Sequence, residues 1–128
     1  MRAFNYSPRY ANAVRVLNRL LDKEFLSAEE IRLYDDQGRV IEYINNRLLV
    51  PVLSMKISRD GEYVRVWYLS QEAIDDYYNR REYQFSQQRH AVAVARQHRK
   101  ASTAARLLLS LGETVPESIR MILAANDD

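Results

Sequence analysis

The feature that most constrains the fold is an Asp-Gly pair between two β-rich runs. Residues 52–58 and 62–69 are rich in β-branched and aromatic side chains, and the segment between them is centred on Asp60-Gly61. Asp-Gly between two such runs is a strong short-range signal for a hairpin. We therefore predict a two-stranded antiparallel hairpin in the middle of the chain.

Helical periodicity precedes this hairpin. Apolar residues recur at helical spacing over 8–24, where Pro8 suits the first turn and Ser7 the N-cap. The segment Ser27-Ala28-Glu29-Glu30 has the form of a capping box. It predicts a short helix from Ala28 to about Asp36, which is followed by a break at Gly38 and a second short helix over about 39–49.

Residues 31–44 also admit a second interpretation, a β-hairpin that turns at 35–38. The capping box and the spacing of Ile41, Ile44 and Leu48 favour two helices over this hairpin.

The chain after residue 70 is predicted to be helical. Ser70 caps a stretch that begins at Gln71 and meets no helix breaker before Gly112. If unbroken to Lys100, this helix spans roughly 45 Å at the usual rise per residue. The alternative is a bend near 98–102, with a separate helix at 103–111. A second capping-box form at 114–117 opens a last helix, which runs to about Ala125.

These elements predict an α+β, mainly helical fold, and composition excludes several other classes. The 128 residues suffice for one compact domain or a small domain with an extension. The chain contains 3 Gly, 3 Pro and no Cys, which excludes collagen-like fibres, disulfides and thiolate metal sites. No apolar run is long enough to cross a bilayer and no signal-peptide core is present, so we expect a cytoplasmic protein.

The net charge of +2 hides a strong segregation of charge. The balance is +4 over residues 1–21, −4 over 22–36 and +6 over 77–106. Arginine, whose planar fork binds phosphate, outnumbers lysine by 16 to 3. Segregated charge in an arginine-rich and tyrosine-rich chain favours a nucleic-acid partner.

The order helix, helix, turn, helix and two-stranded hairpin over 8–69 resembles the winged helix-turn-helix family. The residues that carry the resemblance are 25–31, 38–48 and 66–69, and the likeness is greatest to the small winged-helix DNA-binding proteins of bacteriophages and mobile elements. It implies a winged-helix-like domain over 1–70. Residues 71–128 are then a helical extension for oligomerisation and nucleic-acid contact.

The resemblance also implies which residues contact DNA. The third helix enters the major groove, and its exposed candidates are Arg39, Tyr43, Asn46 and Arg47. The wing contacts phosphate or an adjacent minor groove through Lys56, Arg59 and Arg65. Contacts that position the protein come from Arg9, Arg15 and Arg19. Ordinary solvated surface is the competing interpretation, and the acids of the second helix would repel phosphate: Glu29, Glu30, Asp35 and Asp36.

A second cluster interleaves aromatic rings with arginine over 77–85. This pattern suits single-stranded nucleic acid, whose bases stack on rings while cations follow the backbone. Its basic candidates are Arg80, Arg81, Arg89, Arg96, Arg99 and Lys100. The three- and four-residue spacing from Ile74 to Ala95 predicts a packing seam on the same helix.

No catalytic motif occurs, and His90 and His98 lack the neighbours of a metal site. We therefore expect a non-enzymatic protein without metal or cofactor. The leading hypothesis is an oligomeric, phage-type transcriptional regulator that binds duplex DNA. One alternative is a single-stranded DNA-binding cofactor of the replication or transcription machinery. The other, favoured by the acidic segment 22–36, is a protein-interaction adaptor or inhibitor.

Overall fold

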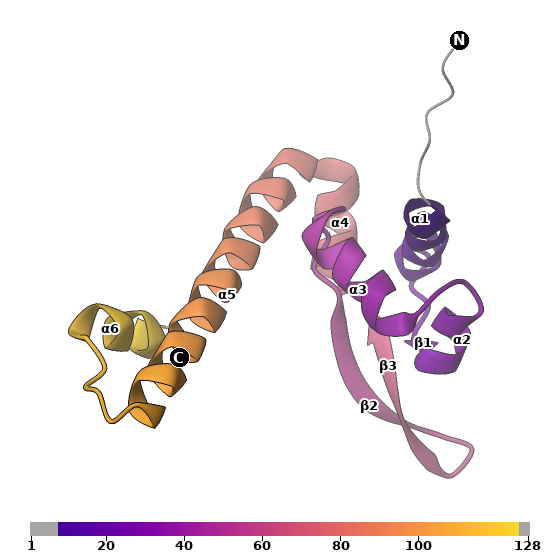
Figure 1. Ribbon diagram of the computed structural model, residues 1–128. Helices are drawn as coiled ribbons and strands as arrows, with labels where there is room; N and C mark the ends of the chain where they lie inside the picture. Colours follow the sequence, from indigo (N-terminus) through magenta and orange to yellow (C-terminus); the bar gives the residue numbers. More distant parts are fainter. Residues whose placement is uncertain (1–7, 126–128) are drawn as a thin grey trace. The chain divides into compact units, whose positions relative to one another are not determined.

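The computed structural model describes residues 8–125, so the predicted N-cap Ser7 lies outside it. The chain folds as two compact units (Figure 1). Unit 1 comprises the described residues up to Arg89, and unit 2 those from His90 onward. The fold is α+β and mostly helical, with one small three-stranded antiparallel sheet.

Unit 1 holds the sheet and most of the helices. Its elements in chain order are α1 (Pro8–Leu21), β1 (Leu26–Ser27), α2 (Ala28–Arg32), α3 (Gln37–Asn46), β2 (Leu53–Arg59), β3 (Glu62–Tyr68), α4 (Gln71–Asn79) and the start of α5 (Arg81–Ser110). The strand order is β1-β3-β2, with both pairs antiparallel. Sequence patterning did not predict β1, because two residues are too few to show an alternation.

The predicted hairpin is confirmed. Arg59 pairs with Glu62, which leaves Asp60 and Gly61 as a two-residue turn. Their φ angles are +52° and +82°, the backbone conformation that a tight turn between twisted strands requires. The hairpin projects beyond the helices of unit 1 (Figure 1).

The region between α1 and the hairpin contains two helices, so the alternative β-hairpin over 31–44 is wrong. The capping box at Ser27 and Glu30 is present. However, α2 ends at Arg32, four residues earlier than predicted, because Asp36 begins the next helix by accepting a hydrogen bond from the Arg39 amide. Gly38, which was expected to lie at the break between the two helices, is therefore in the first turn of α3.

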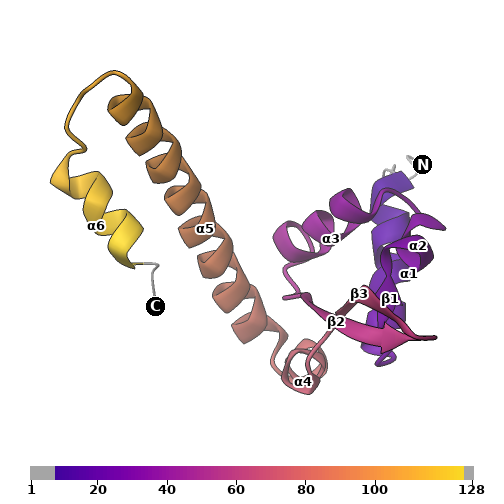
Figure 2. The ribbon, with the colours of Figure 1, turned by 90° about the horizontal axis from the view of Figure 1, so that it is seen from below.

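The core of unit 1 is formed where α1, α2 and α3 meet one face of the sheet (Figure 2). Val16 and Leu20 of α1 pack with Ile31 of α2 and with Ile44 of α3, and all four are fully buried. Trp67 of β3 packs against this core from the sheet. The periodic apolar residues found in the sequence are thus the residues that join helices to sheet.

The helical stretch after the hairpin begins at Gln71 as predicted, with Ser70 as its N-cap. It is interrupted at Arg80, whose φ of −139° and ψ of 48° separate α4 from α5. Beyond that point α5 runs unbroken to Ser110, so the predicted bend near 98–102 is absent. No breaker marks Arg80 in the sequence. The break coincides with tertiary hydrogen bonds made by Arg81 and Gln84, described below.

Unit 2 consists of the later part of α5 and of α6 (Glu117–Ala125), which turns back beside it (Figure 2). The last helix reaches Ala125, where the described residues end. Among the described residues of this unit, Ala101 and Ala105 are buried. Within residues 8–125, none of the helices combines the length and the hydrophobicity that a membrane-spanning segment needs.

Candidate nucleic-acid interface

Helix α3 presents a mixed polar side to solvent. Arg39 and Arg47 are exposed, as expected, and Glu42 lies between them in the sequence and is exposed too. Asn46 is half-buried. Tyr43 is not on the free side: it packs against the core, and its ring meets that of Tyr10 edge-to-face at 6.4 Å between centroids. The cationic side chains that α3 and its C-cap leave available to a ligand are therefore Arg39 and Arg47.

The hairpin carries a second exposed basic group. Lys56 of β2 lies directly opposite Arg65 of β3, and Ser58 lies opposite Tyr63. Directly paired residues of an antiparallel pair share a face, and alternate residues of one strand do too. Lys56, Arg65 and Tyr63 therefore lie on one face of the hairpin, and Trp67 lies further along it where the sheet meets the core.

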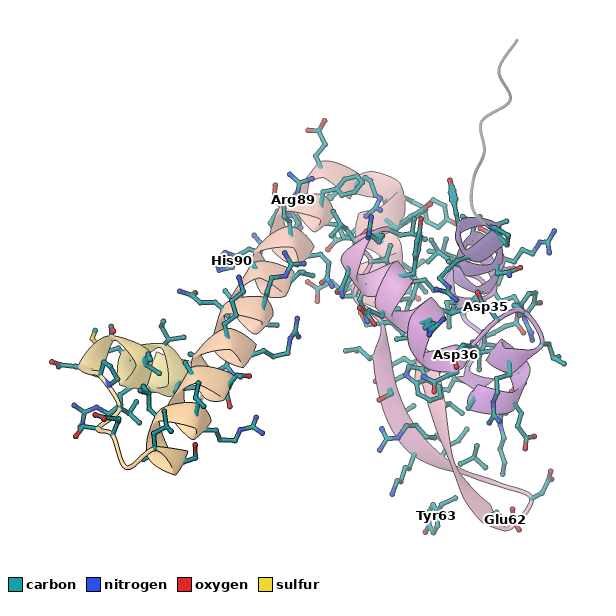
Figure 3. The ribbon with its side chains drawn as sticks, viewed as in Figure 1. Asp35, Asp36, Glu62, Tyr63, Arg89 and His90 are labelled. Carbon is teal, nitrogen blue, oxygen red and sulfur yellow. The ribbon has the colours of Figure 1, made fainter. Side chains whose placement is uncertain are left out.

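Tyr63 is the most exposed large side chain of this group, at 83%. Both it and Glu62 lie near the tip of the hairpin (Figure 3), and they line an open groove together with Glu29 of α2. Arg65 donates from Nη1 to the Ser54 hydroxyl at 3.0 Å and stays exposed. Tyr63 was not among the site residues predicted from the sequence. The two-residue turn nevertheless determines which face of the hairpin each residue occupies, and it places Tyr63 on the same face as Arg65.

Arg59, the third predicted wing residue, is engaged within the protein. Its Nη1 donates to Glu30 Oε1 at 2.7 Å and its Nη2 donates to the Phe25 carbonyl at 2.8 Å. Glu30 also accepts from the Ser27 amide at 3.1 Å. The bond from Arg59, aided by those from Ser27, lowers the pKa of Glu30 below its ordinary value.

Half of the six acids in segment 22–36 pair with arginines from α1. Asp35 accepts from Arg9 Nε at 3.2 Å, and Glu24 accepts from Arg19 Nη2 at 2.7 Å. These bonds lower the pKa of both carboxyl groups. Asp35 and Asp36 lie between α2 and α3 (Figure 3).

This pairing changes the roles expected for the α1 arginines. Arg9 and Arg19, predicted to position DNA, instead bind acids, and Arg15 is the exposed member of the three. The repulsion expected from the acids is correspondingly reduced to that of the exposed Glu29 and Asp36.

Arg81 is a structural residue in this fold rather than a free cation. Its guanidinium donates to the carbonyls of Leu48 and Leu49 and lies 4.0 Å from the centroid of the Phe85 ring. It also lies 4.8 Å from the Tyr77 ring centroid. Burial lowers its pKa. Nearby, Arg80 covers the Tyr83 ring at 3.9 Å. Three rings of the aromatic cluster thus already contact a guanidinium, which weighs against base stacking there.

The remaining basic candidates lie along α5. Arg89 belongs to unit 1, whereas Arg96, Arg99 and Lys100 belong to unit 2, and all four are exposed. Of the predicted seam, Ile74 is buried but Tyr78 is 65% exposed, because Tyr77 rather than Tyr78 packs against the core.

The two histidines lie in unit 2. His90 lines an open groove of about 440 Å³ with Val94 and Gln97 of α5 and with residues of α6. Within residues 8–125 no group of three His, Asp or Glu side chains is placed to hold a metal ion.

Two glutamines of α5 support this region, and one of them, Gln88, belongs to the packing seam predicted from the sequence. Gln84 is buried and donates to the Ala73 carbonyl at 2.8 Å, and Gln88 donates to the Asn45 carbonyl at 3.0 Å. Gln84 lies outside that seam, and a glutamine in a polar helix gives no other indication of such a role.

Comparisons of the chain with family models, with curated proteins and with solved structures found no match.

Proposed function

We propose that unit 1 is a winged helix that binds duplex DNA, with α3 in the major groove and the β2–β3 hairpin as the wing. The order of its elements contains helix, helix, turn, helix and hairpin, as in the family that the sequence resembles. An α-helix fits the major groove, where base edges are distinguishable. The protein acts as a regulator without catalytic activity.

The observation that carries the proposal is the exposed pair formed by Lys56 and Arg65. Like charges directly opposite each other on a sheet destabilise it, and neither cation forms an ion pair with an acid in the part of the chain described. A phosphate group placed between them would remove this repulsion. Arg39 and Arg47 add two further exposed cations on the same unit.

Duplex binding as a function of salt tests this proposal. The double variant Arg39→Ala with Arg47→Ala is expected to lower affinity about tenfold or more and to flatten the dependence of log affinity on log salt. Arg120→Ala, which removes an exposed arginine from α6, is the matched control and should change neither. Unchanged binding by the double variant, or a preference for single strands over duplex, would contradict the proposal.

We also propose that unit 2 associates with a second copy of itself. Two buried alanines provide little apolar burial for two helices, whereas Leu107, Leu111 and Met121 are exposed. Units of this size commonly need association to be stable. Pairing would cover these side chains and would double the number of arginines presented to DNA, which compensates for the small net charge of one chain.

A further inference from the structure

The segment between α3 and β2, residues 47–52, is held in place by side chains from outside it. Arg81 donates from one nitrogen to the Leu48 carbonyl and from Nη1 to the Leu49 carbonyl at 3.1 Å. Asn45 Oδ1 accepts from the Val52 amide at 2.8 Å. The carbonyl of Asn45 in turn accepts from Gln88 at 3.0 Å. We call Arg81 and Gln88 the α5 brace.

The segment needs such support because of its backbone conformation. Leu49 has a φ of +58°, in the left-handed region that residues other than glycine seldom adopt. Such conformations persist where surrounding contacts hold them. Leu49 is also buried, and the Val50 amide donates to the Ile44 carbonyl at 3.1 Å. The end of α3 is thus turned sharply and fixed before the hairpin begins.

The guanidinium of Arg81 is itself fixed on several sides. Phe85 and Tyr77 contact it with their rings, and Gln84 Oε1 accepts from Nη1 at 2.7 Å. A planar fork with several donors makes these contacts together, which the single ammonium of lysine cannot do. The partners of Arg81 are therefore specific to the shape of arginine as well as to its charge.

We propose that Arg81 and Gln88 are positioning residues that set the angle between α3 and the hairpin. This inference rests on the proposed DNA-binding function. Arg39 on α3 and Lys56 on β2 can engage one duplex together only if that angle is correct, and the chain passes from one element to the other through residues 47–52. Binding groups need a rigid supporting shell, because a small misplacement weakens every contact they make.

The variants Arg81→Lys and Gln88→Ala test the brace in two ways. In the free protein, both are expected to speed hydrogen exchange at the Val50 and Val52 amides by about tenfold, the equivalent of one lost hydrogen bond. In duplex binding, Arg81→Lys is expected to lower affinity by about tenfold although the charge is kept. Arg120→Lys is the matched control, because Arg120 is an exposed arginine of α6 that is not part of the brace; it should change neither measurement.

The outcomes separate this inference from the proposed function. If Arg81→Lys binds duplex like wild type while Arg81→Ala weakens binding and its salt dependence, Arg81 contacts phosphate directly and the positioning role is overturned. Unchanged exchange at both amides also overturns it. If Arg39 and Arg47 prove unnecessary for duplex binding, the proposed function fails and the positioning role fails with it, whatever the exchange rates. Should Arg81→Lys not fold, the milder Gln88→Ala decides by the same criteria.

Discussion

Arg59 at the end of β2 binds Glu30 on α2 at 2.7 Å, across 29 residues of sequence. The same guanidinium reaches the carbonyl of Phe25, just before β1. Glu30 meanwhile completes the capping box of α2 and lies 3.6 Å from Arg19 of α1. One ion-pair network therefore ties the turn end of the hairpin to two helices, and the arginine nearest the turn is already bound to protein groups.

This network predicts different effects for two arginines of the hairpin. Arg65→Ala should reduce the salt dependence of duplex binding by about one unit of slope, as expected for one lost phosphate contact. Arg59→Ala should leave that slope unchanged, because its guanidinium already has two protein partners. Anisotropy titrations at several salt concentrations measure both. A lower slope for Arg59→Ala would show that Arg59 leaves Glu30 to bind DNA.

The depressed pKa of Glu30 predicts acid sensitivity. Its folded-state pKa lies below the ordinary value of 4.5, so protonation favours the unfolded chain. The stability that it contributes is full above that value and is lost as the pH falls through the folded-state pKa. As the pH falls below about 5, wild type should lose more unfolding free energy than Glu30→Gln. Denaturant titrations at each pH provide the measurement.

Glu24 and Asp35, whose pKa values are also lowered, remain in both proteins and act as an internal reference. Equal losses in wild type and in Glu30→Gln would contradict the assignment of the effect to Glu30.

Two glycines of unit 1 should respond oppositely to alanine. At Gly61 the φ of +82° strains any side chain, so Gly61→Ala should lower the free energy of unfolding by about 1 kcal/mol. At Gly38, inside α3, an added Cβ would meet Asp36 Oδ1 at an ordinary 3.6 Å. Gly38→Ala should therefore raise stability by about 0.5 kcal/mol through helix propensity. Thermal unfolding of both variants checks these signs, and destabilisation at Gly38 would argue against a helix there.

Self-association through unit 2 predicts a change in mass. Wild type should have the mass of at least a dimer in solution. The double variant Leu107→Ser with Leu111→Ser should reduce it to that of a monomer, because Leu107 on α5 and Leu111 directly after it are both exposed. Thr103→Ala, an exposed polar position of the same helix, is the control. A wild-type protein that stays monomeric at high concentration would refute the proposal.

Local signals in the sequence predicted most elements of unit 1. The Asp60-Gly61 turn and the capping box at Ser27 depend on neighbouring residues alone, and both were predicted correctly. Helix ends were less predictable. From the sequence, Asp36 could cap α3 or end α2. In the structure it caps α3, and the neighbouring Asp35 is bound by Arg9 of α1, a tertiary contact that local signals do not contain.

The candidate site was less predictable than the fold for a related reason. The sequence shows that arginines are abundant but not which of them meet acids or carbonyls. Arg9, Arg19 and Arg59 pair with carboxylates that lie 5 to 29 residues away, and Arg81 bonds to carbonyls more than 30 residues away. Such partners follow from the packing of helices on the sheet, which no periodicity encodes.

Because Trp67 packs against the core of unit 1, the unfolding of that unit can be followed by spectroscopy. The chain has one tryptophan, and all nine tyrosines and three phenylalanines also precede His90, so residues 90–128 contain no aromatic chromophore. Tryptophan emission and near-ultraviolet dichroism will therefore report on unit 1 alone, whereas far-ultraviolet dichroism will register helices in both units. Two spectra of one sample will separate the melting of the two halves without cutting the chain.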